Sequence, residues 1–424
     1  MPEESPSATQ NGPACPAIIT PTQPSCAVDI PDVIVVGTGM GGSTIGFALA
    51  RLGRRVLFLE KGHFRFSGVD WGDGRPCPYA EDSPEARLRR GWWPHPIVGG
   101  TDADRLEFFG PQGCGSGGTS SVYAAQLERF HPADFAPRAH YPDVPGTTLP
   151  EAWPITYENL LPYYREAEAL YRVRGTDDPL NPDPGSPLLE PPPMSERDQA
   201  LFDSLGQLGL HPYRAHVGFE FVEGCQECGG VICPRDCKND AGRICLMPAL
   251  RQHGARILDQ CEVLRLESSG RAVQKVYSRW RGQTLALSAK VVVLAAGAFL
   301  TPGLLLASYS DAYPDGLANG SRLVGHNLML HTGDLLAIHQ WEAASKEGPK
   351  KSIALNDFYI ADGKKLGTVQ SVGVDVSWGS VLHHMRSVTK MAPRWWRSLT
   401  SPFLRLAAHA RAAYFRDSAV LATI

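Results

Sequence analysis

The stretch VIVVGTGMGGSTIGFALARLGRRVLFLE, residues 33–60, decides the fold. It opens on the apolar run Val33–Val36, which is typical of a buried strand and ends at glycines. Apolar residues then recur at helical spacing from Ser43 to Gly53, and a second apolar run follows at Val56–Glu60. Two strands joined through a helix form a βαβ unit, in which the strands are parallel. We therefore expect an α/β fold (mixed α+β) with a Rossmann-like domain built on a parallel sheet.

The glycines between the first strand and the helix have the spacing G-x-G-x-x-G, at Gly37, Gly39 and Gly42. In this context the first permits a tight turn, the second lets the backbone approach a pyrophosphate, and the third lets helix and strand pack closely. Glu60 ends the second strand, where a carboxylate accepts hydrogen bonds from ribose hydroxyls and repels a 2′-phosphate. The candidate residues for an ADP group are Gly37, Thr38, Gly39, Met40, Gly41, Gly42, Glu60 and Lys61. The alternative is a tight turn without a ligand, and this motif does not decide between FAD and NAD.

The composition is that of a globular protein. The chain has 424 residues, 43% of them hydrophobic and 20% charged, with a formal net charge of −3. That charge gives no broad basic surface, so we expect no nucleic-acid partner. There is no run of about 18 apolar residues that would predict a transmembrane helix. Residues 1–27 have the composition of a disordered tail and lack the basic start and apolar core of a secretion signal. We expect a cytoplasmic protein whose cysteines need not form disulfides.

A second glycine-rich stretch, GCGSGGTSSVYAA, occupies residues 113–125. Glycine runs cost backbone entropy, so they indicate that something approaches the main chain closely. The alternative is a flexible linker. Residues 152–173 then have helical spacing with a predicted break near Pro162, and residues 177–198 form a proline-dense connector.

Short strands are predicted over residues 256–290, with a turn at 268–270. Residues 291–308 return to strand, glycine and helix, with Thr301 and Pro302 as the expected cap and first helical position. The simplest organisation is a nucleotide-binding domain whose chain leaves to build a second domain and then returns.

Six stretches make the chain resemble the glucose–methanol–choline (GMC) oxidoreductases, which are flavoprotein alcohol dehydrogenases and oxidases. They span residues 33–333 in the family's order: VIVVGTGMGGSTIGFALARLGRRVLFLEKG, GCGSGGTSSVYAA, AWPITYENLLPYYREAEALYRV, CKNDAGRICLMPAL, VVVLAAGAFLTPGLLLAS and GSRLVGHNLMLHTG. The resemblance implies FAD as the cofactor, with its ADP half on the first glycine loop. It also gives the second glycine loop a use that an NAD-linked dehydrogenase would not have.

The resemblance implies further cofactor residues. Val263 matches a position whose backbone meets the adenine, and Tyr123 and Ala124 would end at the edge of the flavin ring. Ala296 and Gly297 match the strand end that closes over the cofactor. The residues that match the loop along the flavin and its pyrophosphate are Gly113, Gly115, Ser116, Gly117, Gly118, Thr119 and Ser120.

The catalytic base of the family is a histidine in a late segment, beyond the region that matches GSRLVGHNLMLHTG. This chain stops at FRDSAVLATI, so we expect that histidine to lie beyond residue 424 and no catalytic residue within the chain. His326 and His331 are the alternative bases. We expect them instead to be packed or hydrogen-bonded, because they match a structural strand region.

Four cysteines crowd into CQECGGVICPRDCKNDA, at Cys225, Cys228, Cys233 and Cys237. Thiolates at short spacing in a glycine-rich loop can hold an iron–sulfur cluster. The resemblance implies such a three-cysteine site in some GMC dehydrogenases, with Cys228, Cys233 and Cys237 as the candidate ligands. Zinc is a second option, although its usual paired C-x-x-C motif is not repeated, and free thiols or a disulfide are a third.

Residues 392–415, APRWWRSLTSPFLRLAAHARAAYF, mix arginine with aromatic and aliphatic residues. Such a stretch is typical of an interfacial membrane helix, or of a domain helix with one packed face and arginines that reach to solvent. We favour the second and expect no membrane association, with an interruption of the helix at Pro402.

The sequence predicts FAD-dependent oxidation of a CH–OH group in an alcohol, sugar or sterol by hydride transfer to flavin. Oxygen, a quinone or a carrier protein would take the electrons. The alternative is a truncated flavin-binding protein without turnover. We expect an FAD-binding domain from residues 28–140 and 240–333, and a substrate-binding or cap domain from residues 141–239 and 334–424.

Overall fold

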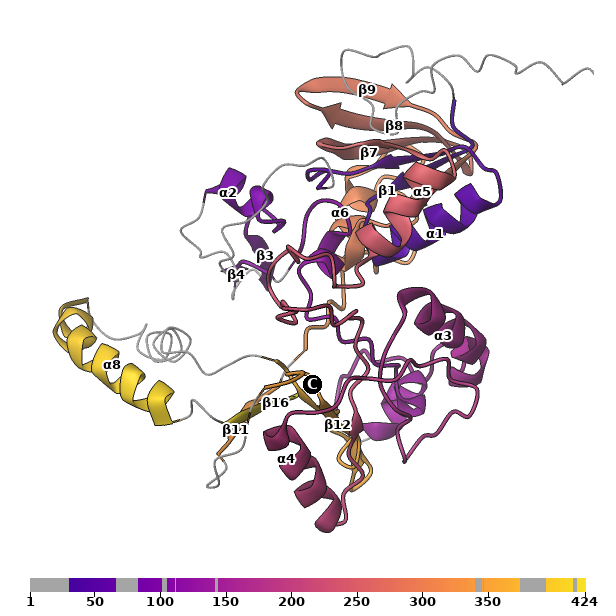
Figure 1. Cartoon of the computed structure of the whole chain (residues 1–424). Helices are drawn as coiled ribbons and strands as arrows, with labels where there is room; N and C mark the ends of the chain where they lie inside the picture. The colour runs from indigo at the N-terminus through magenta and orange to yellow at the C-terminus, as the bar shows by residue number, and fades with distance from the viewer. Residues whose placement is uncertain are drawn as a thin grey trace, which may run out of the picture. The chain divides into compact units, whose positions relative to one another are not determined.

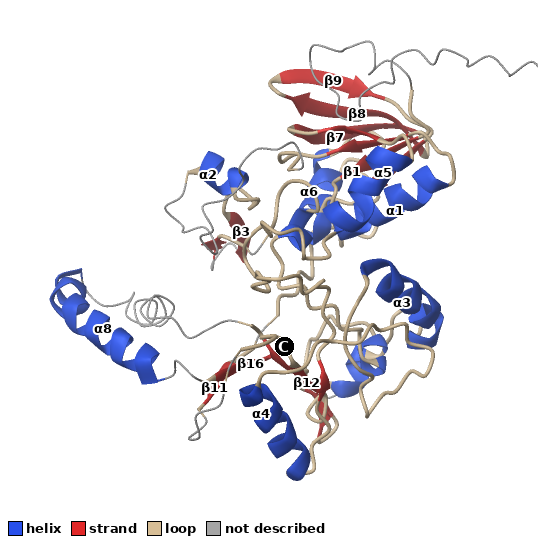
Figure 2. Cartoon of the chain, viewed as in Figure 1, coloured by secondary structure: helices blue, strands red, loops and turns tan. Residues whose placement is uncertain are grey.

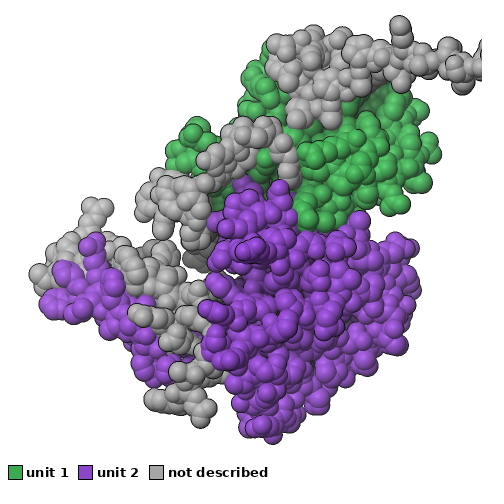
Figure 3. Space-filling view, in the orientation of Figure 1, with its two compact units in different colours: residues 1–121, 241–328 green, residues 122–240, 329–424 purple. Residues whose placement is uncertain are grey.

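The computed structural model describes residues 30–65, 83–100, 105–110, 112–141, 144–331, 333–339, 345, 347–373, 394–414 and 418–424. The predicted disordered tail lies outside them. The chain divides into two compact units, shown in Figure 3. The first consists of residues 1–121 and 241–328, and the second of residues 122–240 and 329–424. The first crossing between units thus falls at residue 121, earlier than the domain boundary that we expected at residue 140.

A parallel sheet forms the centre of the first unit, with the strand order β10-β1-β2-β6. Its strands are β1 (Val33–Val36), β2 (Val56–Leu59), β6 (Arg256–Leu258) and β10 (Val291–Leu294). In the parallel register Val36 lies between Leu59 and Leu294, so the carboxyl ends of these three strands meet at one edge. Helix α1 (Met40–Arg51) connects β1 to β2. This arrangement confirms the α/β, Rossmann-like fold.

The sheet is covered on both faces because successive strand residues point in opposite directions. Val33 and Val35 share a buried cluster with residues of α1 and of α5 (Met247–Gln252). Ile34 and Val36 pack on the other face with residues of β7 (Cys261–Ser269), β8 (Ala272–Trp280) and α6 (Gly297–Ala307). Figure 1 labels β1 of this sheet, together with the helices α1, α5 and α6 of the same unit. The first unit also contains α2 (Pro84–Arg89), β3 (Ile97–Gly100), β4 (Arg105–Phe108), β9 (Gln283–Leu287) and a π-helical turn at Gly242–Leu246.

The second unit contains an antiparallel sheet with the order β11-β16-β15-β12-β5. Its strands are β5 (Tyr213–Arg214), β11 (Leu335–Ile338), β12 (Ile353–Leu355), β15 (Val369–Ser371) and β16 (Ala419–Thr423). The hairpin β13 (Ile360–Ala361) and β14 (Lys364–Lys365) and the helices α3 (Tyr157–Tyr171), α4 (Glu196–Gln207) and α8 (Arg394–Tyr414) belong to the same unit (Figure 2). Short 3₁₀ turns lie at Pro132–Phe135 and Pro137–His140.

Three predicted helix details are wrong. Helix α1 begins at Met40 rather than Ser43, because the chain turns into the helix directly after Gly39. Helices α3 and α8 continue through Pro162 and Pro402, so each proline removes one backbone hydrogen bond without ending its helix. Helix α6 begins at Gly297, so Thr301 lies inside the helix and is not its N-cap. The Thr301 hydroxyl accepts a hydrogen bond from the Ala296 N–H at 3.1 Å.

Helix α8 has a buried Ala408, whereas Phe403 and Leu406 are 74% and 71% exposed. These two side chains therefore do not lie on the packed face that we expected for this helix. None of the helices in the described ranges combines the length and the apolar character that a bilayer crossing requires.

Candidate cofactor-binding site

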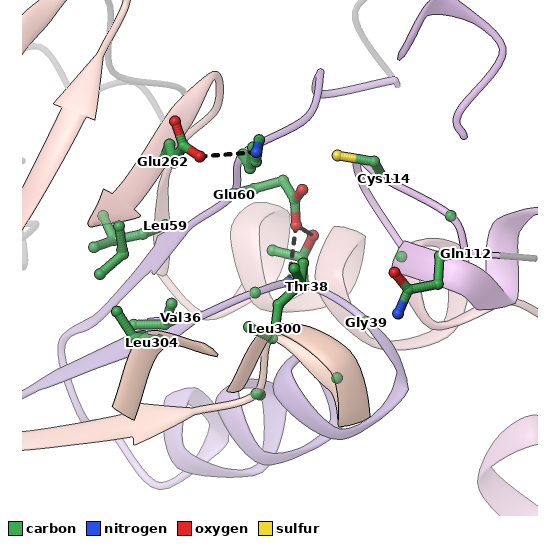
Figure 4. A pocket seen from close by; sticks show the side chains of 18 of the residues that line it. Val36, Thr38, Gly39, Leu59, Glu60, Gln112, Cys114, Glu262, Leu300 and Leu304 are labelled. Carbon is green, nitrogen blue, oxygen red and sulfur yellow. Dashed lines mark hydrogen bonds and ion pairs between the residues drawn. The ribbon is translucent and has the colours of Figure 1, made fainter. Parts of the chain in front are cut away.

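A pocket of about 520 Å³ lies at the carboxyl ends of β1, β2 and β10 in the first unit (Figure 4). One part of its wall is apolar and is formed by Val36, Leu59 and Leu304. Polar groups come from Thr38, Glu60 and Gln112. Pockets for cofactors and small ligands measure roughly 300–1,000 Å³. In open α/β sheets, ligands bind at this edge of the strands. Size and position thus agree with a nucleotide-type ligand.

The first glycine loop can be built only with glycines at two positions. Gly37 has a φ of +95°, and a Cβ on it would lie 2.5 Å from the carbonyl oxygen of Ala295. A Cβ on Gly42 would lie 2.1 Å from the carbonyl oxygen of Gly37. Helix α1 starts behind this turn with Gly39 as its N-cap, with no side-chain cap and no acidic residue in its first turn. Its first N–H groups can therefore serve an anion.

The second glycine loop is in backbone contact with the first. Gly115, Gly117 and Gly118 have φ values of +120°, +84° and +53°, and the chain then forms a 3₁₀ turn over Gly118–Ser121. A Cβ on Gly118 would lie 2.7 Å from the Cα atom of Gly39. One pair of glycines therefore lets the two loops form a single wall of the pocket.

Glu60 joins the two loops. Its Oε2 atom accepts hydrogen bonds from the backbone N–H of Thr38 at 3.0 Å and from the Thr38 hydroxyl at 2.6 Å. Its Oε1 atom accepts from the N–H groups of Gly62 at 2.8 Å and Gly115 at 3.0 Å. A carboxylate offers about four acceptor positions, so donors of the chain itself use them all. The ribose contact that we predicted for Glu60 needs one of these donors to move.

Lys61, Glu262 and Trp93 form a charged rim. The Lys61 Nζ atom lies 2.8 Å from Oε1 of Glu262 and 4.1 Å from the centroid of the Trp93 ring. Burial alone would raise the pKa of the Glu262 carboxyl, but the hydrogen bonds and charges of Lys61 and Arg279 together outweigh burial and hold that pKa below its ordinary value. The rim therefore presents an ion pair rather than a lone lysine.

Gln112 is a pocket residue that the sequence analysis missed. It directly precedes the second glycine loop, and its side chain is drawn in the pocket wall in Figure 4. In the described part of the chain its buried Oε1 atom has no hydrogen-bond partner. A buried amide oxygen without a partner costs free energy, which a polar ligand in the pocket would offset.

Most of the predicted cofactor residues line the pocket: Gly37, Thr38, Gly39, Met40, Gly41, Glu60, Lys61, Gly113, Gly118, Thr119, Ser120, Val263, Ala296 and Gly297. Gly42, Gly115, Ser116 and Gly117 belong to the loops without lining it. Tyr123 and Ala124 fall in the second unit. Trp93 and Gln112 are among the wall residues that no sequence motif marked. Cys114 also lines the pocket, and burial raises the pKa of its thiol well above the ordinary value, so this thiol is neutral.

Neither alternative base lies at the pocket. His326 and His331 are both exposed rather than packed, and neither lines the pocket. Among the described residues, those that line the pocket include no histidine.

The cysteine loop lies in the second unit and brings sulfur atoms close together. Cys237 Sγ lies 3.3 Å from Sγ of Cys233 and 3.3 Å from Sγ of Cys225. Burial raises the pKa of Cys228, and a hydrogen bond with Cys233 adds to this effect. Within the described residues, no group of three or more His, Cys, Asp or Glu side chains is arranged to hold a metal ion. The predicted ligands Cys228, Cys233 and Cys237 are thus near one another without forming a metal site.

The buried Lys238 connects this loop to the segment that follows the second glycine loop. Its Nζ atom donates hydrogen bonds to the carbonyl oxygens of Tyr123 and Val231, both at 2.9 Å. Burial lowers the pKa of Lys238 to about 8. The Tyr123 hydroxyl in turn donates to the carbonyl oxygen of Asn239 at 2.8 Å.

Comparisons with known proteins find similar sequences over most of the chain. The family model described as GMC oxidoreductase matches residues 31–333. The 2-methyl-1,2-propanediol dehydrogenase of Mycolicibacterium austroafricanum is 31% identical over 397 residues, which are 88% of this chain and 68% of that protein. The 6'''-hydroxyparomomycin C oxidase of Streptomyces lividus is 27% identical, over 85% of this chain and 66% of that protein. The fructose dehydrogenase large subunit of Gluconobacter japonicus is 28% identical, over 71% and 58% respectively.

A solved structure supports the same fold. Formate oxidase of Aspergillus oryzae superimposes with a TM-score of 0.54 at 17% sequence identity, over 82% of this chain and 68% of that one. The chain thus spans about two thirds or less of the length of these similar proteins.

Proposed function

Because the chain belongs to the GMC oxidoreductase family, we propose that it binds FAD in this pocket and serves the oxidation of a CH–OH group. The observation that carries the proposal is the wall made by two glycine loops in backbone contact at Gly39 and Gly118. A nucleotide alone needs only the first loop. A second loop at backbone distance suits a ligand with an extended flat group next to its pyrophosphate.

The residues present fit FAD. The volume is sufficient for a cofactor, the uncapped start of α1 suits a pyrophosphate, and the buried Gln112 Oε1 atom is an acceptor in need of a donor. We propose that the first loop holds the pyrophosphate, that the backbone of Val263 meets the adenine, and that the second loop runs along the flavin. When bound, FAD supplies the acceptor for the hydride of the alcohol.

The residues of the chain would bind and orient this cofactor. Glu60 keeps the two loops at a fixed separation through its bonds to Thr38 and Gly115, and the apolar side chains of Leu300 and Leu304 exclude water from one wall. The proton of the substrate hydroxyl needs a base. Since none of the described residues that line the pocket is a histidine, we propose that this base comes from elsewhere in the protein.

The substrate class that we propose is a small alcohol, polyol or sugar. The relatives are named for a diol, a sugar and an aminoglycoside. Oxygen, a quinone or a carrier protein remain the candidate electron acceptors, and the sterol class and a cytoplasmic location remain predictions from sequence.

The visible absorption spectrum of the chain, purified without added cofactor, tests the FAD site. Flavin bands, or their recovery after FAD is added to colourless protein, are the expected result. Titration with NAD under the same conditions is the control and should give weaker binding. A soluble protein that takes up no FAD would overturn the proposal.

A flavin-binding protein without turnover is the second candidate, and it rests on the observation that no histidine is found among the described residues that line the pocket. Anaerobic mixing of the FAD-loaded protein with a panel of diols, sugars and primary alcohols separates the two. Bleaching of the flavin bands by any alcohol supports the oxidoreductase, and bands that persist with every alcohol support the second candidate.

For the cysteine loop we infer free thiols, because the Sγ–Sγ distances of 3.3 Å correspond to thiol contacts and no metal arrangement is present in the described ranges. An iron–sulfur cluster on Cys228, Cys233 and Cys237 is the competing hypothesis. Iron and sulfide assays on anaerobically purified protein distinguish them. Stoichiometric iron would replace the thiol interpretation, and protein without iron would end the cluster hypothesis.

A further inference from the structure

Arg65 is a buried cation directly behind the second glycine loop. It follows β2 in the first unit, is 7% exposed, and does not line the pocket. Its guanidinium donates hydrogen bonds to the carbonyl oxygens of Cys114 at 2.5 Å and Gly91 at 3.2 Å, and to the hydroxyl of Ser121. No sequence motif marked this residue.

The contacts of Arg65 hold both ends of the loop. Cys114 lies near its start and Ser121 at its end, and the Ser121 hydroxyl passes the connection on by donating to the carbonyl oxygen of Gly118 at 2.8 Å. The backbone N–H of Arg65 also donates to the Ser116 hydroxyl at 3.3 Å. One side chain therefore fixes the separation between the two ends of the bend.

Two glycines make room for this guanidinium. A Cβ on Gly115, which has a φ of +120°, would lie 2.8 Å from an Arg65 terminal nitrogen and 2.9 Å from its Nε atom. A Cβ on Gly91 would lie 2.4 Å from a terminal nitrogen of Arg65. Both glycines have a positive φ, which favours glycine in any case, and their lack of a Cβ also leaves room for the arginine.

The chemistry of arginine suits this position. A guanidinium presents donors in a rigid fork and keeps its charge in proteins. A buried cation is tolerated when its donors are hydrogen-bonded, and the carbonyls of Gly91 and Cys114 meet this need. A lysine would keep the charge, but it could not bridge three acceptors in one plane.

We propose that Arg65 is a positioning residue that holds the second glycine-rich loop in the conformation that binds the flavin half of FAD. It acts through the loop, by way of the carbonyl oxygen of the pocket residue Cys114, and does not itself line the pocket. The proposal deepens the proposed function and rests on it, because it requires that the flavin half lies along this loop.

ADP binding to the first loop separates a positioning role of Arg65 from a general structural role. Arg65 contacts the second loop at Cys114, Ser116 and Ser121, whereas the ADP half would bind the first loop. Loss of Arg65 should therefore weaken FAD binding while ADP binding persists. A purely structural role in the whole unit would weaken both.

The experiment titrates FAD-stripped protein with FAD and, separately, with ADP. The variants are Arg65→Lys and Arg65→Met. The control is Arg197→Lys in the second unit, a similarly buried arginine that is paired with Asp198. Hydrogen bonds to charged groups contribute about 1.5–3 kcal/mol. We therefore expect the FAD dissociation constant of Arg65→Lys to rise about tenfold or more, while its ADP dissociation constant stays within about twofold of wild type. For the control variant, the dissociation constants of both FAD and ADP should stay within about twofold of wild type.

Each outcome is decisive. Unchanged FAD binding in Arg65→Lys, or a parallel loss of FAD and ADP binding, overturns the positioning role. If Arg65→Met does not fold, Arg65→Lys with its thermal transition measured still decides. Wild-type protein that binds ADP but not FAD would reject the proposed function itself, and the role of Arg65 with it.

Discussion

The two glycine-rich loops meet in one wall of the pocket but reach their shapes in different ways. The first is closed by contacts among its own residues, since Gly42 packs against Gly37 and the Ser43 hydroxyl donates to the carbonyl oxygen of Thr38 at 2.7 Å, and Glu60 is its additional support from outside. The second is held from outside, by Arg65, by Glu60 and by the N–H of Ala241, which donates to the Ser120 hydroxyl at 3.0 Å.

This difference has a physical consequence. A loop that is closed locally depends on the steric fit of a few backbone atoms, so a single added methyl group breaks it. A loop that is held by tertiary hydrogen bonds has several supports, each contributing about 1 kcal/mol, or more where a charge is involved. We therefore expect a single substitution at Gly37 or Gly42 to disrupt the first loop. Each substitution at a support of the second loop should weaken that loop only in part.

The largest loss of stability should come from Gly42→Ala. The new Cβ atom would lie 2.1 Å from the Gly37 carbonyl oxygen, so the backbone must shift. We expect the free energy of unfolding in urea to fall by about 3 kcal/mol, the upper end of the range for overpacked sites, and ADP binding to be lost. Gly41→Ala is the matched control, because a Cβ there meets no atom within 4 Å. It should be as stable as wild type or slightly more stable. Equal stability of the two variants would show that the first loop is not closed by this contact.

Glu60→Gln should cause the next largest loss of stability, and it is the one change that we expect to weaken both loops. An amide places an NH₂ group against N–H donors at Thr38 or Gly115. We expect a loss of about 2 kcal/mol in the free energy of unfolding and weaker binding of both ADP and FAD, unlike Arg65→Lys.

Glu262→Gln provides the control for Glu60→Gln. It removes a carboxylate at the same pocket whose salt bridge with Lys61 is partly exposed, and such pairs contribute about 1 kcal/mol or less. If the two glutamine variants have the same stability and the same ADP affinity, Glu60 does not join the loops.

The same difference explains what could be predicted from the sequence. The turn at Gly37–Gly42, β1 and β2 follow from local spacing, and the structure confirms them. The predicted start of α1 differs by three residues because Gly39 is a poor sequence signal for a cap. The predicted breaks at Pro162 and Pro402 are wrong because one lost hydrogen bond does not by itself end a helix.

The supports of the second loop could not be predicted in the same way. Arg65, Trp93 and Gln112 lie in stretches without periodicity or motif, and their partners are distant in sequence. Only the three-dimensional contacts show that a buried guanidinium lies against Gly115, where the φ of +120° and the His63 carbonyl oxygen also favour a glycine.

The smallest change in the free energy of unfolding is expected for substitution of Gln112. This substitution is also the most diagnostic, because stability should rise while FAD affinity falls. Its Oε1 atom is buried without a partner in the described chain, so Gln112→Leu removes a group that costs free energy in the FAD-free protein. We expect the free energy of unfolding to rise by up to about 1 kcal/mol, while FAD affinity falls severalfold because the leucine offers no acceptor. Gln126→Leu is the control, since the Gln126 amide donates to the Ser371 carbonyl oxygen at 2.8 Å and its loss should destabilise the protein without changing FAD affinity. A Gln112→Leu protein that is more stable and still binds FAD like wild type would mean that the second loop presents its backbone alone to the cofactor, and that the amide before it is not part of the site.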